Sequence, residues 1–66
     1  MRYFVHCNYI THDINGGYCT VIEMNGKIEN IDDIKSIGEL LVQEIEEKVQ
    51  KKVQSISITN YIEIHV

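Results

Sequence analysis

A chain of 66 residues is expected to form one domain, because it buries only about 60% of the surface that its unfolded form exposes and cannot support two cores. Ten acidic against six basic side chains give a net charge of −4, which provides no basic surface for a nucleic-acid backbone. No segment reaches the roughly 20 apolar residues of a membrane span, and the start of the chain lacks a signal-peptide pattern. We therefore expect a cytoplasmic protein that contacts neither nucleic acid nor membrane.

Domains this small usually need a disulfide, a metal or a second subunit, because core burial alone rarely contributes more than about 3 to 5 kcal/mol. The chain has two cysteines, Cys7 and Cys19, and in the cytoplasm we expect both to be reduced thiols. The sequence therefore does not predict a stabilising disulfide.

The first predicted element is a strand over residues 2–10, RYFVHCNYI, in which Tyr3, Val5, Cys7 and Tyr9 occupy alternate positions. This period of two indicates one buried face. The stretch THDINGG contains Asx and Gly residues that tolerate a positive φ and therefore predicts a turn. A β-branched and aromatic run, YCTVIEM, follows it, so we expect a hairpin whose second strand covers residues 17–24.

An amphipathic helix is predicted over residues 31–51. Asn30 is suited to the N-cap, because its side chain can accept a free amide hydrogen of the first turn, and Asp33 stands where the acid of a capping box would lie. Acidic residues near the start and lysines near the end match the helix dipole. One apolar stripe follows the helical period: Ile34, Ile37, Leu41, Ile45 and Val49.

A last strand is predicted over residues 54–66. The residues expected on its buried face are Ile56, Ile58, Ile62, Ile64 and Val66, with Asn60 as an interruption of that register. The twelve residues SISITNYIEIHV would span roughly 40 Å, which exceeds the usual strand length. We therefore expect part of the segment to leave the sheet or to bend at Asn60.

The order strand, strand, helix, strand predicts an α+β fold, a three-stranded, mainly antiparallel sheet with one amphipathic helix packed on one face. Two strand orders are open: 2-1-3, in which the last strand lies beside the first, and 1-2-3. The end of the last strand, YIEIHV, would have unpaired backbone groups and an apolar face. We therefore expect a homodimer, formed either by edge pairing or by exchange of this segment between subunits.

Residues 6–19, HCNYITHDINGGYC, gather the residue types of metal and thiol sites. Cys7 and Cys19 lie too far apart for the close pairs of a structural zinc site. A hairpin register could place them opposite each other on a partly buried face, where cysteine acts as a small apolar residue. His12 and Asp13 are adjacent and do not aim at each other, so Asp13 is expected to hydrogen-bond the turn backbone. NGG lacks the spacing of a phosphate loop. We expect no enzyme, no catalytic residue, no cofactor and no metal.

Five aromatic side chains exceed what one small core needs, and tyrosines left at a surface are good binding anchors. The acidic helix face could mimic the phosphates of DNA, but a solvated face is the simpler interpretation. The candidate surface for a partner or a dimer combines the hairpin loop with the end of the last strand. Its residues are Tyr9, His12, Asp13, Tyr18, Tyr61, Ile62, Ile64 and His65.

The layout RYFVHCNYI, NGGYCTVIEM, IENIDDIKSIGELL and VQSISITNYIEI resembles a group of small uncharacterised proteins encoded by phages and prophages of Firmicutes. The similarity covers most of the chain. Some proteins of this size and setting are anti-defence proteins that bind and block a host immune complex, for instance the Hachiman anti-defence protein. The resemblance implies such a role for this chain, and it brings no catalytic motif and no functional residue with it.

These observations lead us to expect a non-enzymatic, homodimeric binding protein of phage type, which inhibits a host protein complex by occupying one of its surfaces. Two alternatives come from other classes. A protein that sequesters a small molecule or nucleotide at the dimer boundary would need buried polar groups around Gly16 and Gly17. A metal-binding regulator would use Cys7, Cys19 and His12.

Overall fold

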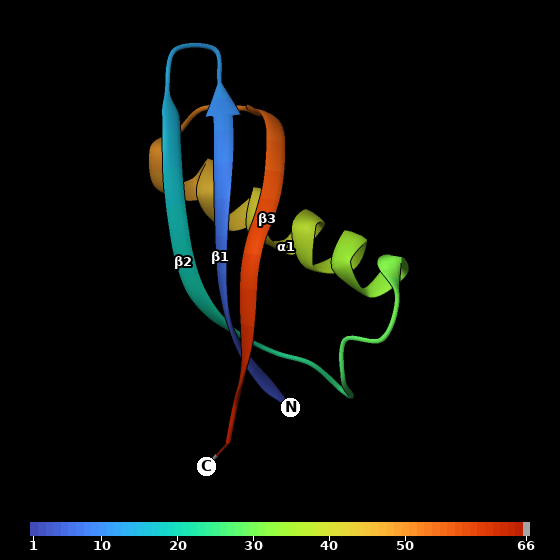
Figure 1. Ribbon diagram of the computed structural model, residues 1–66. Helices are drawn as coiled ribbons and strands as arrows, with labels where there is room; N and C mark the ends of the chain where they lie inside the picture. The colour runs from blue at the N-terminus through green and yellow to red at the C-terminus, as the bar shows by residue number, and fades with distance from the viewer. Residues whose placement is uncertain (66) are drawn as a thin grey trace.

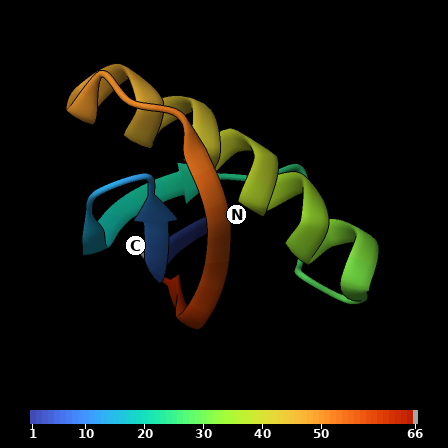
Figure 2. The same cartoon turned by 90° about the horizontal axis from the view of Figure 1, so that it is seen from above.

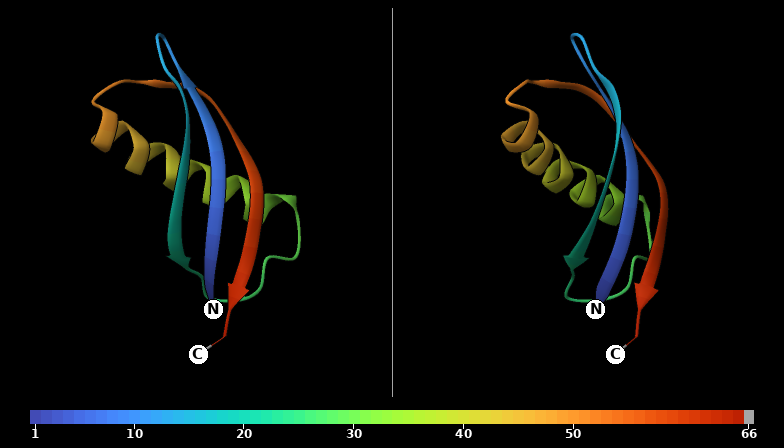
Figure 3. Two further views of the ribbon diagram at one scale, coloured as in Figure 1. Left: turned by 60° about the vertical axis from the view of Figure 1, so that its left-hand side comes forward. Right: turned by 90° about the vertical axis from the view of Figure 1, so that its left-hand side faces the viewer.

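The computed structural model describes residues 1–65 and contains four elements: β1 (Arg2–Thr11), β2 (Asn15–Glu23), α1 (Ile31–Val49) and β3 (Val53–Ile64) (Figure 1). The strands form an antiparallel sheet of order β2-β1-β3, with β1 in the centre. α1 crosses one face of this sheet diagonally and leaves the other face uncovered (Figures 2 and 3). The predicted α+β fold and the strand order 2-1-3 are confirmed, and the order 1-2-3 is wrong.

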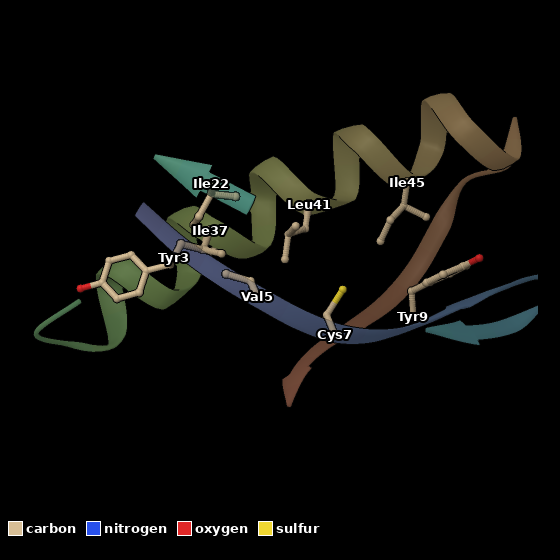
Figure 4. Packing of buried hydrophobic residues seen from close by; sticks show 8 residues of the cluster. All are labelled: Tyr3, Val5, Cys7, Tyr9, Ile22, Ile37, Leu41 and Ile45. Carbon is tan, nitrogen blue, oxygen red and sulfur yellow. The ribbon is translucent and has the colours of Figure 1, made fainter. Parts of the chain in front are cut away.

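The hydrophobic core lies between α1 and the helix-facing side of the sheet (Figure 4). Alternate residues of β1 supply half of it, as the period of two predicts. The buried apolar residues are Tyr3, Val5, Cys7, Tyr9, Ile22, Ile37, Leu41 and Ile45. Burying a large apolar side chain contributes about 1.5 to 3 kcal/mol, so this cluster is the main source of stability.

The start of α1 is set by the predicted cap. The Asn30 side chain accepts hydrogen bonds from the amides of Asp32 and Asp33 at 3.0 and 3.2 Å, and the Asp33 carboxylate accepts one from the amide of Asn30 at 3.3 Å. This reciprocal pair is a capping box, with aspartate in the role of the usual glutamate. The helix ends at Val49, two residues before the predicted end, because Gln50 adopts a left-handed conformation with φ of 58°.

Two hydrogen bonds attach the connecting segments to the core. The Tyr3 hydroxyl accepts a bond from the Ile28 amide at 3.0 Å, which ties the segment before α1 to β1. The Glu46 carboxylate accepts one from the Val53 amide at 2.9 Å, which ties the first residue of β3 to the helix. The two ends of α1 are therefore both linked to the sheet.

β2 begins at Asn15, two residues before the predicted start, because the double glycine is part of the strand. Gly16 and Gly17 pair with Tyr9 and Asn8, and neither glycine has a positive φ. The requirement at Gly16 is space: a Cβ there would lie 2.8 Å from Cζ of the Tyr9 ring. Glycine thus permits the close approach of a core tyrosine, and the expectation that it supplies a positive φ is wrong.

β3 lies beside β1 from Val53 to Ile64, so no part of it leaves the sheet. The pairing is irregular at Gln54 and next to Asn60, where a bend was the other expectation. Its pairing contains a β-bulge, because His6 pairs with Asn60 and Cys7 with Ile58, which leaves Thr59 without a partner in β1. The Thr59 hydroxyl donates a hydrogen bond to the His6 carbonyl at 3.0 Å. The extra residue is thereby anchored to the central strand.

The bulge reverses the two faces of β3. Ile56 and Ile58 pair with helix-facing residues of β1, whereas Ile62 and Ile64 pair with residues on the uncovered side. The predicted single buried face is therefore wrong, because one inserted residue shifts a period of two to the opposite side. Val66, which was assigned to the same face, lies outside the described residues.

Candidate binding surface

The uncovered face of the sheet carries a row of apolar side chains that crosses all three strands. Phe4 in β1 pairs with Val21 in β2 and with Ile62 in β3. These three side chains are 41%, 54% and 56% exposed, and Ile64 lies next to Ile62 on the same side. We call Phe4, Val21, Ile62 and Ile64 the apolar stripe. Contiguous exposed apolar side chains of this kind typically mark an interaction site.

Polar residues border the apolar stripe on both sides. Arg2 pairs with Glu23 beyond one side, and His6 pairs with Cys19 and Asn60 beyond the other. An apolar centre with a polar rim is the usual composition of a protein interface. The uncovered face therefore has the arrangement expected of a docking surface.

The row formed by Cys19, His6 and Asn60 brings together a thiol, an imidazole and an amide. The Thr59 hydroxyl donates its hydrogen to the His6 carbonyl. The same hydroxyl also contacts Nδ1 of the His6 imidazole, and in that hydrogen bond Nδ1 is the donor. The other nitrogen, Nε2, lies toward Gly17, where a Cβ would be 3.5 Å from it. The imidazole is thus held by the bulge through Thr59.

The two cysteines lie on opposite faces of the sheet. Cys7 pairs with Tyr18 and is fully buried under α1, whereas Cys19 pairs with His6 and is exposed. The hairpin register that could have placed them opposite each other on one face differs from the observed register by one residue. Burial raises the pKa of the Cys7 thiol, and the nearby Cys19 adds to this increase. Cys7 is therefore a neutral core residue.

A metal site built from Cys7, Cys19 and His12 has no common centre in this fold. The two thiols face away from each other, and His12 lies exposed in the loop between β1 and β2. Within residues 1–65, no three His, Cys, Asp or Glu side chains gather closely enough to hold a metal ion. The geometry gives these residues no shared role.

The eight residues predicted for a partner surface fall into two groups at opposite ends of the sheet. Tyr9 and Tyr18 lie at the hairpin end on the helix-facing side, where Tyr9 is only 9% exposed and belongs to the core. Tyr18 is half-buried, with the Lys48 ammonium 5.4 Å from its ring centre. His12 is exposed at the loop tip. Tyr9 and Tyr18 therefore contribute mainly to packing and only little to the exposed surface.

Asp13 in the same loop forms an ion pair with Lys51 at 2.6 Å. The hydrogen bond from Lys51 lowers the pKa of this carboxyl, with a smaller contribution from the Thr11 hydroxyl. The turn backbone is held by Thr11, whose hydroxyl accepts bonds from the amides of Asp13 and Ile14 at 3.4 and 3.0 Å. Asp13 therefore links the hairpin loop to the segment that leads into β3. A hydrogen bond from its own backbone amide, the smallest of the causes that lower its pKa, agrees with the predicted bond to the turn backbone.

The second group lies at the end of β3 and is divided between the two faces. Tyr61 faces the helix side and packs edge-on against Tyr3, with ring centres 6.1 Å apart. His65 pairs with Glu63 at 2.9 Å. Ile62 and Ile64 lie in the apolar stripe on the other side. Of the predicted surface residues, only these two join the contiguous apolar surface.

Phe4 and Val21 complete the apolar stripe, and the sequence analysis did not include them in a site. Phe4 was visible as an apolar residue that breaks the alternation of β1. Its cross-strand neighbours depend on the hairpin register and on the β3 bulge, which the pattern does not reveal. A large aromatic residue on the polar face of a strand was the available signal.

No protein-family model, no curated protein and no solved structure matches this chain. No helix within residues 1–65 is long and apolar enough to cross a membrane. The geometry of the sheet and the chemistry of its faces are therefore the basis for an inference about function.

Proposed function

We propose that this protein is a non-enzymatic binding protein of phage type, which works as a homodimer in the host cytoplasm and inhibits a host defence complex by covering one of its surfaces. The observation that carries the proposal is the apolar stripe on the uncovered face of the sheet. Exposed aromatic and aliphatic side chains in the centre of a polar rim are the anchors that protein interfaces use.

The placement of the reactive side chains supports a binding role over an enzymatic one. Cys7 is buried, and Cys19 pairs across the strands with His6, whose Nδ1 contacts the Thr59 hydroxyl. Asp13 is paired with Lys51 at the far end of the molecule. A catalytic site needs a nucleophile and a base within hydrogen-bond reach of each other. Cys7 and Asp13 lie apart from the other reactive groups, and among the described residues His6 makes its side-chain hydrogen bond to Thr59 and none to Cys19.

The sequestering alternative has weaker support. A hollow exists at the hairpin, where Asn8, Asn15 and the two glycines Gly16 and Gly17 contribute to its lining. Its amide side chains are exposed instead of buried. A small molecule held there would keep much of its contact with water, whereas ligand sites usually enclose most of the ligand.

The test compares phage plating on bacterial strains that each carry one defence system, with and without expression of the protein. The wild-type protein should restore plating on a strain whose defence complex it blocks. The double variant Phe4→Thr/Ile62→Thr removes two anchors of the apolar stripe while keeping β-forming residues. Loss of two such anchors should weaken binding by at least about tenfold and abolish the protection.

Leu40→Gln is the matched control, because Leu40 is 51% exposed on α1, on the other side of the molecule. This variant should protect phage as well as the wild-type protein does. Full activity of the stripe variant would overturn the assignment of the surface. Failure of the wild-type protein to protect phage on any strain of a broad panel, together with a nucleotide that copurifies with it, would favour sequestration.

A further inference from the structure

A groove runs between α1 and the free edge of β3, on the side of the molecule away from β2. The first half of α1 extends past β3, so the helix overhangs the unpaired edge of this strand (Figures 1 and 2). The groove has a volume of about 420 Å³. Its apolar lining comes from both elements: Ile31, Ile34, Gly38 and Val42 of α1, and Ile56 and Ile58 of β3. Lys35 and Glu39 lie at the same groove.

The helix contributes to the groove with a second apolar stripe, separate from the one in the core. Ile37, Leu41 and Ile45 face the sheet, whereas Ile31 in the second stripe is 75% exposed. A surface helix of a small domain normally has a polar face outside its core stripe. Apolar residues that follow the helical period beyond the sheet indicate a face that is covered by another element.

The strand contributes a backbone edge that can pair. β1 occupies one side of β3, and no strand from residues 1–65 lies on the other side. Residues 53–62 contain no charged residue and no proline, which are two of the usual means of protecting an edge strand, and the β-bulge at Thr59 lies past the middle of this stretch. A strand added here would lie below the overhanging helix and place its side chains against Ile34, Gly38 and Val42.

We infer that the occupant of this groove is a second copy of the same chain, which pairs its β3 antiparallel to the first around a two-fold axis perpendicular to the sheet. The inference rests on the proposed homodimer and gives it a different surface from the C-terminal segment YIEIHV. With the axis near Ser57, Ile56 of one copy lies opposite Ile58 of the other, so the apolar residues below the helices form one row.

Charge complementarity favours a second copy over an unrelated strand. An antiparallel crossing of the two helices near Gly38 places Lys35 of one copy beside Glu39 of the other, and the two-fold axis repeats this pair. Gly38 has no side chain at this crossing, and a Cβ there would meet nothing within 4 Å. Although the chain has a net charge of −4, the groove carries both a positive and a negative side chain, so two copies can pair opposite charges there.

A dimer at this groove would have to bury a sizeable share of the surface of the chain. Stable interfaces take about 800 Å² from each partner, which is about one sixth of the 4790 Å² surface of the chain. The axis is perpendicular to the sheet, so the apolar stripes of both copies face the same direction. The dimer therefore presents a six-stranded face with two docking stripes, and a target that contacts both gains avidity.

Reciprocal charge exchange tests this arrangement by sedimentation equilibrium at low salt. The variants are Lys35→Glu, Glu39→Lys and the double exchange Lys35→Glu/Glu39→Lys. Each single exchange creates two like-charged pairs across the axis, so the dissociation constant should rise about tenfold, and the double exchange should restore it. Lys27→Glu and Glu47→Lys carry the same charge changes outside the groove and should leave association near the wild-type level.

Glu39→Lys separates the proposal from general repulsion, because it changes the net charge from −4 to −2. General repulsion predicts stronger association for this variant, whereas the reciprocal pair predicts weaker association. Gly38→Phe is a second, uncharged test: a Cβ at this position meets nothing within 4 Å, so the ring extends into the groove and should abolish the dimer.

The outcomes distinguish this inference from the proposed function. Weakening by both single exchanges and recovery in the double exchange support the groove. A dimer that persists unchanged in both single variants and in Gly38→Phe overturns the groove and leaves the proposed function intact. A wild-type protein that sediments as a monomer overturns both.

Discussion

The contact between Gly16 and Tyr9 predicts different effects for the same substitution at two neighbouring positions. In Gly16→Ala, the new Cβ would lie 2.8 Å from Cζ and from the hydroxyl oxygen of Tyr9. In Gly17→Ala, the nearest atom is His6 Nε2 at 3.5 Å, which is an ordinary van der Waals distance. Neither glycine has a positive φ, so backbone strain does not contribute at either position.

The magnitude follows from the displacement that the alanine requires. An ordinary contact is at least 3.4 Å, so the Tyr9 ring would have to move by about 0.6 Å or more. Tyr9 is 9% exposed and packs in the core near Ile45, as Figure 4 shows, so this movement disturbs packed neighbours. Overpacking of this kind costs about 1 to 3 kcal/mol. Replacement of glycine also removes freedom from the unfolded chain, which offsets about 0.4 to 1 kcal/mol at both positions.

Urea unfolding of the two variants at one protein concentration measures the difference. Gly16→Ala should be less stable than Gly17→Ala by about 1 to 3 kcal/mol, because the effect on the unfolded chain is common to both and cancels. In a thermal scan, each kcal/mol corresponds to about 4 to 8 °C for a domain of this size. Equal stability of the two variants would refute the close approach of Tyr9 to β2.

Three further predictions address the core, the hairpin loop and the thiols. Leu41→Ala should lower the free energy of unfolding by about 2 to 5 kcal/mol in urea, because Leu41 is fully buried, and a smaller loss would contradict its place in the core. Lys51→Ala should raise the pKa of Asp13 in an NMR titration, because it removes the hydrogen bond that lowers this pKa. In the wild type the lowered pKa stabilises the folded state at pH values above the pKa of Asp13 in the unfolded chain. This stabilisation is lost as the pH falls through the pKa of Asp13 in the folded protein. A thiol reagent should modify Cys19 at once and Cys7 only on unfolding, so equal rates would refute the register of β2.

The parts of the fold that depend on neighbouring residues were predictable from the sequence. Asn30 and Asp33 are three residues apart and make the whole capping box by themselves, so the start of α1 could be located. The alternation in β1 likewise identified Tyr3, Val5 and Cys7 as core residues, because a strand presents every second side chain to one face.

The errors arose where a distant strand decides the outcome. The bulge at Thr59 depends on its contact with His6, 53 residues earlier. Asn60 marked an interruption at this place in the sequence, but the alternation does not show that one residue is inserted there. One such residue was enough to move Ile62 and Ile64 to the uncovered face. The hairpin register was wrong for a similar reason: the glycines were assigned to a turn, although Gly16 lies within the strand to make room for a tyrosine.

The candidate surfaces were only partly visible for the same reason. Ile62 was named because it belongs to the last strand, but its neighbours Phe4 and Val21 come from two other strands and meet it only through the register. The groove under α1 required the direction of the helix across the sheet. The sequence shows an apolar residue, Ile31, at the start of the helix, but it does not show that this end of the helix passes the edge of β3.

Both the proposed function and the groove depend on the association of two copies, and the mass of the wild-type protein in solution tests this most directly. Light scattering at micromolar concentration should give twice the 7.7 kDa of one chain, with dissociation only on further dilution. A mass of one chain at every concentration up to 100 times that level would contradict the homodimer, and with it the double docking face.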